Sequence, residues 1–288
     1  MNQIIVNKFL ANFLLPLTFI LIPLQGAQAR WFEIPSPEQA IEQFGHASEC
    51  SGLDAHSINV FVWNIYKEQK PDFYSEFGRL SQGKDLLLLQ EGYQTPDFLN
   101  LVNANSDYFF TMATSFIYSK KNIATGVVTA SPVQPLKSQY LASPGKEIVG
   151  GTPKAVLLTY FTFKNSHETL LVANIHALNS VTSKTFAKHI DQVANVLKNH
   201  SGPAIFAGDF NTWSKKKLGY LQSKMQKIKM QSVSFSNGDE RMKTFGHALD
   251  WIYTRCFSQH FTHVESQSKG SDHKALNAKL ALDMQRCR

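Results

Sequence analysis

The sequence contains little cysteine, a modest share of charged residues and one long apolar stretch, which lies at its N-terminus. Three cysteines in 288 residues are too few for a disulfide-stapled scaffold. Charged residues make up 18% of the chain and hydrophobic residues 43%, which excludes an intrinsically disordered protein. No internal repeat, low-complexity run or long flexible linker divides the sequence, so we expect one domain after the N-terminal segment.

Basic residues outnumber acidic ones, with 29 Lys and Arg against 22 Asp and Glu and a formal net charge of +7. A basic surface favours an anionic partner, either nucleic acid or phospholipid. The same excess is also ordinary for a soluble protein, so charge alone does not identify the partner.

Residues 1–29 have the order of a signal peptide. Lys8 precedes an apolar stretch from Phe9 to Leu24, and Ala27-Gln28-Ala29 provides small residues for cleavage. The alternative is an uncleaved membrane anchor, but the stretch is short and contains Pro16 and Pro23. We therefore expect export to the periplasm or the medium, and a mature domain of residues 30–288.

Apolar, strand-like runs alternate with amphipathic stretches along the mature chain, which predicts an α/β fold. A helix is expected around Phe186, Ile190, Val193 and Leu197, and a short one is expected to begin at Ser36-Pro37. The strand-like runs are Ile58–Trp63, Asp85–Gln90, Gly126–Ala130, Ala155–Phe163, Leu170–Ile175 and Pro203–Ala207.

Polar residues collect at one end of these runs. Four runs end at Asn64, at Glu91, at His176 and at Asp209 with Asn211, whereas Asp250 and the pair Asp272-His273 each precede an apolar run. If the last two strands run opposite to the first four, all of these side chains meet at one edge of the sheet. Rigid strand ends at such an edge are suited to an active site.

The chemistry of this set indicates a metal-assisted hydrolase. Four carboxylates in one cleft, from Glu91, Asp209, Asp250 and Asp272, would repel one another without a cation. Oxygen ligands favour Mg²⁺, Mn²⁺ or Ca²⁺ over Zn²⁺, and the sequence contains neither CxxC nor HExxH. With two histidines and no evident activated Ser or Cys, attack of water on phosphorus is the expected reaction.

Six short motifs contain these residues, in the order Trp63-Asn64-Ile65, Leu89-Gln90-Glu91, Asn174-Ile175-His176, Gly208-Asp209-Phe210-Asn211, Leu249-Asp250-Trp251-Ile252 and Ser271-Asp272-His273. Together they resemble the motifs of the endonuclease/exonuclease/phosphatase superfamily, which includes DNase I, abasic-site endonucleases, sphingomyelinases and inositol-polyphosphate phosphatases. The resemblance covers nearly the whole mature chain, and no single motif is specific.

This resemblance implies a four-layer α/β sandwich, with two mixed sheets face to face and helices outside. It also implies Glu91 as the main metal ligand, supported by Asn64 and Asp272, with Mg²⁺, Mn²⁺ or Ca²⁺ bound. Asp209 would orient or deprotonate the attacking water, and Asn211 would contact a phosphate oxygen.

The two histidines have different implied roles. His273, paired with Asp250, would act as base or would stabilise the transition state. His176 stands where the DNase I and sphingomyelinase branches have a second histidine, but no acidic partner is evident for it, because Glu168 precedes its strand. A plainer reading makes His176 a core residue and Asn64 a turn residue.

Three kinds of function remain open. We expect a phosphate-rich substrate, with an exported nuclease first and Lys215–Lys217 as a candidate phosphate contact. One alternative is a phospholipid phosphodiesterase or phosphoinositide phosphatase, which needs a membrane-touching loop. The candidates are Phe109-Phe110 and Tyr140–Gly151, and neither is an exposed aromatic hairpin. The other alternative is a binding homologue without catalysis. No obligate protein partner is evident, and a monomer is expected.

The remaining expectations concern residues outside the site. His189, His200, His260 and His263 lack acidic companions and are expected on the surface. The three cysteines are expected at the sheet edge opposite the site, and a bond between Cys50 and Cys287 would tie both ends of the mature chain.

Overall fold

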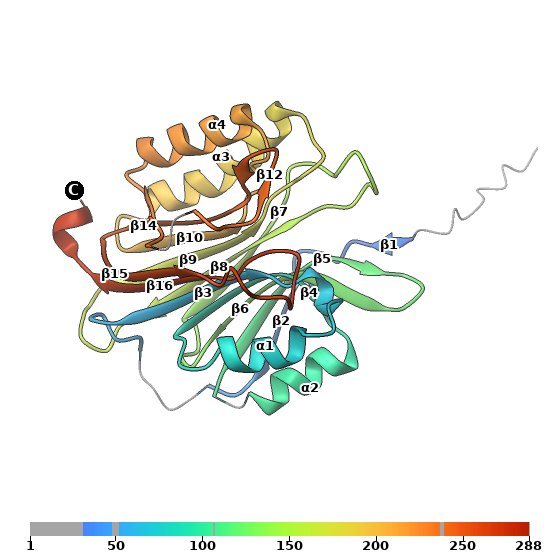
Figure 1. Cartoon of the computed structure of the whole chain (residues 1–288), viewed down its shortest axis with the longest axis horizontal. Coiled ribbons are helices and arrows are strands. Elements are labelled where there is room, and N and C mark those ends of the chain that lie inside the picture. Colours follow the sequence, from blue (N-terminus) through green and yellow to red (C-terminus); the bar gives the residue numbers. More distant parts are fainter. Residues whose placement is uncertain (1–30, 48–51, 106, 237–238, 288) are drawn as a thin grey trace, which may run out of the picture. The chain divides into compact units, whose positions relative to one another are not determined.

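The computed structural model describes residues 31–47, 52–105, 107–236 and 239–287, so the predicted signal peptide lies outside the described residues. Two large mixed sheets face each other, and helices cover their outer sides (Figure 1). The α/β class and the four-layer arrangement expected from the sequence are confirmed.

The first sheet has eight strands. They are β1 (Phe32–Glu33), β2 (Ile41–Gly45), β3 (Ile58–Asn64), β4 (Leu86–Tyr93), β5 (Phe109–Tyr118), β6 (Ile123–Ser131), β15 (Phe257–Val264) and β16 (Leu276–Leu282). Their order is β1-β5-β6-β4-β3-β16-β15, with β2 paired to β5. β3 and β4 are parallel, and β16 runs antiparallel to β3, as expected.

The second sheet has the order β11-β14-β10-β9-β8-β7. Its strands are β7 (Lys137–Ala142), β8 (Ala155–Thr162), β9 (Thr169–His176), β10 (Ala204–Asp209), β11 (Gln231–Ser232) and β14 (Asp250–Arg255). β9 and β10 are parallel, and β14 is antiparallel to β10. A separate hairpin consists of β12 (Lys243–Thr244) and β13 (His247–Ala248).

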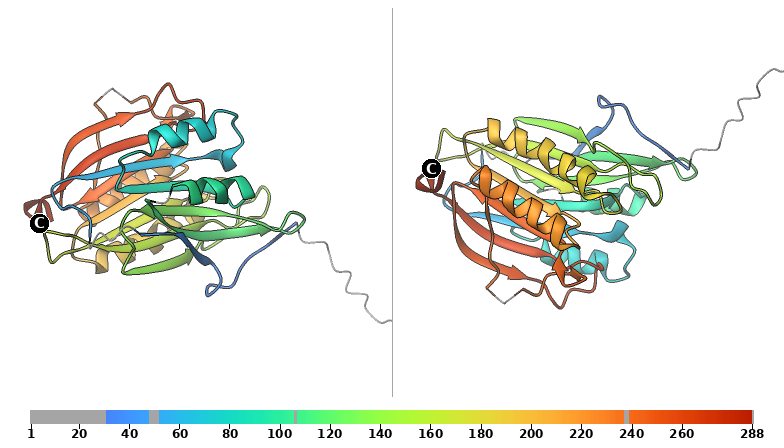
Figure 2. Two further views of the ribbon diagram at one scale, coloured as in Figure 1. Left: turned by 90° about the horizontal axis from the view of Figure 1, so that it is seen from below. Right: turned by 90° about the horizontal axis from the view of Figure 1, so that it is seen from above.

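The helices divide between the two outer faces. α1 (Phe73–Leu80) and α2 (Pro96–Ala104) pack on the first sheet, and α3 (Ser183–Asn199) and α4 (Lys215–Lys227) pack on the second. Figure 2 shows the first pair from below and the second from above. Two short 3-10 turns, η1 (Tyr66–Glu68) and η2 (Met284–Cys287), complete the described elements.

Successive residues of the central strands are buried on opposite sides. Val60 and Val62 of β3 pack between the sheets, whereas Phe61 and Trp63 pack against α1. Burial on both faces explains why these runs are continuously apolar instead of alternating. The central strands could be predicted from the sequence because their apolar runs are continuous.

One polar side chain connects the two sheets inside this apolar interior. Asn174 of β9 donates through Nδ2 to the carbonyl oxygens of Leu89 at 3.1 Å and Val128 at 2.9 Å. Its Oδ1 accepts from Gln90 Nε2 at 2.8 Å. Asn174, which belongs to one of the sequence motifs, therefore has a structural contact in the core.

The prediction of a helix that begins at Ser36-Pro37 is wrong. Residues 37–40 form a turn and bend, and the chain continues directly into β2. β2 pairs with β5 over five residues, so sheet pairing replaces the local helix signals.

The predicted disulfide between Cys50 and Cys287 is also wrong. Cys256 pairs with Cys287, and Cys50 lies outside the described residues. Cys256 separates β14 from β15, while β16 returns beside β15 with Leu282 opposite Phe257. η2 then folds back, so Cys287 is placed next to Cys256. None of the helices among the described residues is long and apolar enough to cross a membrane.

Candidate active site

Three strand ends of the second sheet bring polar side chains together. Asp209 at the end of β10 is the register partner of His176 on β9 and of Asp250 on β14. Because β14 is antiparallel, its first residue lies beside the last residues of the other two strands. The expected meeting of these groups at one edge is confirmed for this sheet.

The first sheet contributes Asn64 and Glu91 from neighbouring strand ends. Asn64 is the last residue of β3, and Glu91 lies at a bulge of β4 between Gln90 and Gly92, with a φ of 59°. A bulge removes one residue from the ladder and redirects its side chain. Glu91 Oε1 consequently lies 4.0 Å from His176 Nε2 of the other sheet.

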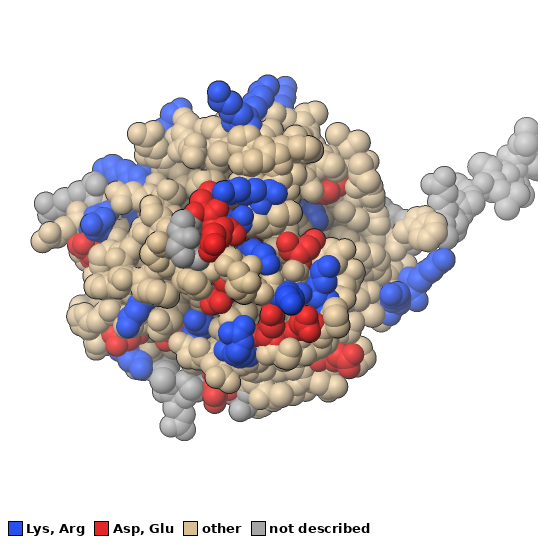
Figure 3. All heavy atoms as spheres, in the orientation of Figure 1, with Lys and Arg blue, Asp and Glu red and all other residues tan. Residues whose placement is uncertain are grey.

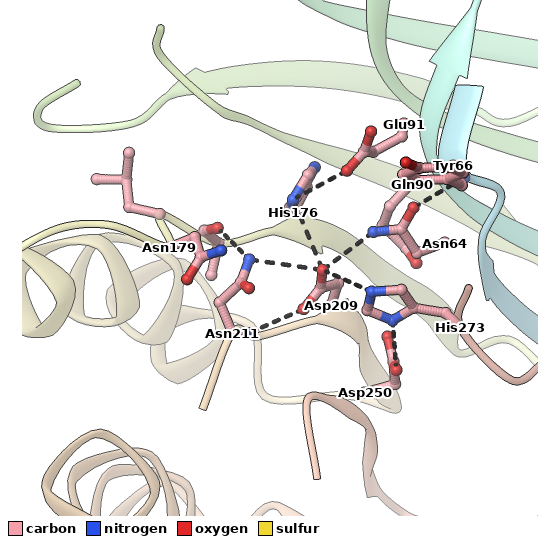
Figure 4. A network of polar contacts seen from close by, with 12 residues as sticks. Asn64, Tyr66, Gln90, Glu91, His176, Asn179, Asp209, Asn211, Asp250 and His273 are labelled. Carbon is pink, nitrogen blue, oxygen red and sulfur yellow. Dashed lines mark hydrogen bonds and ion pairs between the residues drawn. The ribbon is translucent and has the colours of Figure 1, made fainter. Parts of the chain in front are cut away.

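Asp209 is the centre of the polar network in Figure 4. Its Oδ2 accepts from Asn64 Nδ2 at 3.0 Å, and its Oδ1 accepts from the backbone N–H of Asn211 at 2.9 Å. The Nε2 atoms of His176 and His273 lie 3.6 and 3.9 Å from Oδ2. Burial raises the pKa of Asp209, and the charge of His273 opposes that rise.

His273 forms a close pair with Asp250. The ring Nδ1 lies 2.8 Å from Asp250 Oδ2, and the backbone N–H of His273 donates to Ser271 Oγ. Burial disfavours the charged ring, but the carboxylates of Asp250 and Asp209 outweigh burial and raise the pKa of His273 to about 10. His273 is therefore a buried imidazolium that faces Asp209 through Nε2.

His176 has the opposite electrostatic character. Burial, together with the nearby charge of Lys154, holds its pKa well below the ordinary value for histidine. The ring is thus neutral, and it lies between Glu91 and Asp209. These two carboxylates are the acidic neighbours that the sequence did not reveal, because neither is adjacent to His176 along the chain.

The contacts join seven of the eight predicted site residues: Asn64, Glu91, His176, Asp209, Asn211, Asp250 and His273. Asn211 also donates through Nδ2 to the carbonyl of Ala177 at 2.9 Å. Asp272 is exposed and outside this network, but Ser271 Oγ lies 3.3 Å from its Oδ1 and donates to the carbonyl of Asn64. The roles of all eight stay predictions.

The donor set fits a hard divalent cation. Glu91 and the Oδ1 of Asn64 offer oxygen ligands, and Glu91 retains 17% side-chain exposure. Asp209, Asp250 and His273 also have donor atoms within 4.8 Å of one another. In that trio, however, His273 Nδ1 and Asp250 Oδ2 already bond to each other, which favours a hydrogen-bonded pair over a metal cage.

Two lysines near the site were missed from sequence. Lys67 in η1 forms an ion pair with Glu91, and Lys154 lies in the same cavity as Glu91 and His176. Lys67 follows Asn64 by only three residues, so its place near the site could have been predicted from the sequence. Lys154 precedes β8 and had no such signal.

Two expectations for surface residues are wrong. Lys217 is buried, and its Nζ donates to the carbonyl of Asn179 at 2.6 Å, so it is not a surface phosphate contact, although Lys215 and Lys216 are exposed. His189 is fully buried on the inner face of α3. Its helical spacing from Phe186 and Val193 already placed it near the apolar stripe.

Residues 61–273 match the model of the endonuclease/exonuclease/phosphatase family. A UPF0294 protein of Vibrio campbellii is 32% identical over 229 residues, which are 79% of each chain, and one of Klebsiella pneumoniae is 31% identical over 76% of this chain and 80% of its own.

Among solved structures, an endonuclease/exonuclease/phosphatase family protein from Leptotrichia buccalis has a TM-score of 0.62 at 14% identity, covering 78% of this chain and 100% of its own. The Bacteroides thetaiotaomicron mannosyl-6-phosphatase Bt3783 has a TM-score of 0.61 at 16% identity, with coverages of 78% and 100%. The human Nocturnin catalytic domain has a TM-score of 0.59 at 15% identity, with coverages of 86% and 100%.

Proposed function

Because the chain belongs to the endonuclease/exonuclease/phosphatase family, whose members hydrolyse phosphoester bonds, we propose that it is a divalent-metal-dependent phosphodiesterase with water as nucleophile. The observation that supports this most directly is the buried Asp209 carboxylate between a neutral and a charged histidine. The neutral ring can form a hydrogen bond to a reacting group, and the charged ring can stabilise negative charge that develops in the reaction.

Asp209 is suited to orient the attacking water and to accept its proton. Asn64 and Asn211 fix the carboxylate through hydrogen bonds to its two oxygens, so it has one orientation in the site. The imidazolium of His273 stabilises the negative charge that develops on the phosphorus oxygens, and Asp250 keeps this ring charged and oriented.

A cation held by Glu91 and Asn64 would polarise the phosphoryl oxygens and neutralise charge on them. His176 is positioned between Glu91 and Asp209 as a neutral hydrogen-bonding group at the substrate phosphate. These roles use the chain's own side chains in the positions that the structure describes.

The reaction can be tested with bis-p-nitrophenyl phosphate. We expect EDTA to abolish hydrolysis and Mg²⁺ or Mn²⁺ to restore it, and we expect Asp209→Asn or His273→Gln to reduce kcat by at least ~100-fold. Asp97→Asn, an exposed carboxylate at the start of α2, is the matched control. Hydrolysis at the wild-type rate by the Asp209 and His273 variants would overturn the proposed site, and an inactive wild type would favour a binding homologue.

Nucleic acid is the first proposed substrate class from the sequence, on the basis of net charge and of Lys215 and Lys216. On the face shown in Figure 3, basic and acidic side chains are interspersed and form no continuous basic band. Incubation of the metal-loaded protein with plasmid DNA, RNA, phosphoinositides and phospholipids would identify the substrate class. Hydrolysis of lipid without nucleic acid would remove the nuclease proposal.

We also propose export of the mature domain of residues 30–288 as a monomer. The support is the signal-peptide pattern in residues 1–29. Cell fractionation combined with mass determination of the N-terminus tests it, and an uncleaved cytoplasmic chain would contradict it.

A further inference from the structure

A cavity of about 610 Å³ opens directly from the candidate catalytic residues. Glu91, His176, Lys67 and Lys154 line it. Aromatic residues of β1 and β5 belong to the same lining. This size lies within the range of small-molecule binding sites in proteins.

A bulge in β5 contributes to the aromatic part of the lining. The register between β5 and β6 shifts between Thr114 and Phe116, so Ser115 and Phe116 both line the cavity although they are adjacent. Phe116 packs edge-to-face on Phe32 at 5.4 Å and on Tyr118 at 5.0 Å between ring centroids. These contacts hold the rings against one another and leave an apolar wall.

The charged part of the lining contains a cation that is suited to a phosphate. Lys154 lies close enough to His176 to lower its pKa, in addition to the effect of burial. Lys67 is paired with Glu91, whereas Lys154 has no ion pair with any described residue. One phosphate beside Lys154 would thus share the cavity with the aromatic rings.

Exposed apolar side chains belong to the segments that line the cavity. Trp31 is 74% exposed, and Ile148 and Val149 are 74% and 75% exposed on the loop that contributes Gly150 and Thr152 to the lining. This loop is held in place, because the backbone N–H of Ile148 donates to the carbonyl of Ser180 and Glu147 accepts from the N–H of Asn179. Exposed apolar side chains that are fixed around a cavity indicate a binding surface.

We propose that this cavity binds the hydrocarbon part of a phospholipid whose phosphodiester lies at Glu91 and His176, while Trp31, Ile148 and Val149 contact the lipid surface. This inference rests on the proposed phosphodiesterase function and names its substrate class. The rim includes a cation, because Lys120 Nζ lies 4.8 Å from the centroid of the Trp31 ring. A nucleic-acid strand would need a continuous row of cations, however, and the exposed Ile148 and Val149 provide none. In the reaction, water bonds to phosphorus, one ester P–O bond breaks, and the leaving oxygen takes a proton, which gives a phosphomonoester and an alcohol.

Chain length provides the first test, with soluble dibutanoyl and dihexanoyl phosphatidylcholine, phosphatidylglycerol and phosphatidylethanolamine below their micellar concentrations. Each methylene that enters the cavity should improve KM about fourfold. We therefore expect kcat/KM for at least one head group to be ~10-fold or more higher for the longer chain. Phe32→Ser should reduce this preference mainly through KM.

The rim is tested by binding as well as by turnover. Wild-type protein should float with phosphatidylcholine vesicles at 0.15 M salt, where attraction between net charges is weak. The double variant Ile148→Ser/Val149→Ser should float at least ~5-fold less. Leu136→Ser is the matched control, because Leu136 is an exposed apolar residue at the opposite end of β7 from the rim loop.

Bis-p-nitrophenyl phosphate separates the two proposals. If wild-type protein hydrolyses this small diester but shows no chain-length preference and no vesicle binding, the phospholipid inference is overturned and the phosphodiesterase proposal stands. If it hydrolyses neither, the proposed function itself fails. A preference for single-stranded DNA that Phe32→Ser removes would assign the cavity to a nucleobase instead.

Discussion

At the scale of single residues, His189 links the stability of the fold to pH. The ring is fully buried, its Nδ1 accepts from the backbone N–H of Leu178 at 3.3 Å, and burial lowers its pKa to about 3. In the unfolded chain this pKa returns to its ordinary value of ~6.5. The contribution of the buried neutral ring to the free energy of unfolding is therefore complete above pH ~6.5. It is lost as the pH falls toward 3, because the unfolded chain then binds a proton that the folded ring does not bind.

Urea unfolding at pH 7 and pH 5 measures this contribution. Protonation of His189 in the unfolded state should remove about 2 kcal/mol of the free energy of unfolding between these pH values. His189→Gln, which keeps an acceptor without a titrating ring, should show a smaller fall by that amount. The exposed His260→Gln should behave like wild type, and an identical fall in all three proteins would contradict the assignment.

Residues of the candidate site were recognised from sequence more readily than the residues around them. Asn64, His176 and Asp209 each end a strand that its apolar run reveals. Lys154 and Phe116 reach the same cavity through a loop and a bulge, and neither has a local sequence pattern that predicts this position. Long-range pairing decides where such residues lie.

At the scale of elements, Gly208 allows β10 and β9 to approach closely just before Asp209. Its φ is +137°, and a Cβ at this position would lie 2.0 Å from the carbonyl oxygen of Ile175. Asp209 and His176 lie at the ends of these two strands, and any larger residue at position 208 would force the ends apart.

Gly208→Ala should therefore lower the free energy of unfolding by about 2 kcal/mol or more, through strain and steric overlap. Thermal and urea unfolding measure the loss. Gly219→Ala on α4 is the control, because a Cβ there meets nothing within 4 Å and should stabilise the helix by about 0.5–1 kcal/mol. Equal stability of the Gly208 variant and wild type would show that the strands can separate without cost.

The elements that were predicted correctly are those with a clear burial pattern. The β3 and β10 runs are continuously apolar because both of their faces are buried, and α3 shows the helical period of its one buried face. The turn at residues 37–40 was mistaken for a helix, because a capping pattern describes only local contacts, and β2 forms through its partner β5.

At the scale of the whole molecule, the Cys256–Cys287 disulfide attaches the C-terminal turn to the junction between the two sheets. The two cysteines are 31 residues apart in the sequence, and the loop that the bond closes contains β15 and β16. Restricting the unfolded chain over a loop of this length stabilises a fold by about 4 kcal/mol.

Reduction with dithiothreitol should remove this amount from the free energy of unfolding. The double variant Cys256→Ser/Cys287→Ser should have the same lower stability and should no longer respond to the reductant. Cys50→Ser should keep the response, whereas loss of the response in this variant would show that Cys50 is one of the bonded residues.

The four-layer architecture was predictable because it followed from the ordered motifs, whereas the disulfide pairing was not. Pairing depends on how β16 returns along β15 and on the turn that follows, and these are set by sheet register. Which cysteine lies near Cys287 is therefore a property of the finished fold.

The bonds of Asn174 to Leu89, Val128 and Gln90 bear on how the site is kept in alignment. Asn64 and Asp209 belong to different sheets, and apolar side chains between the layers resist separation far better than they resist sliding. Directional hydrogen bonds across the interior oppose such lateral slip. Asn174 thus helps to fix the offset between the two sheets whose edges form the candidate site.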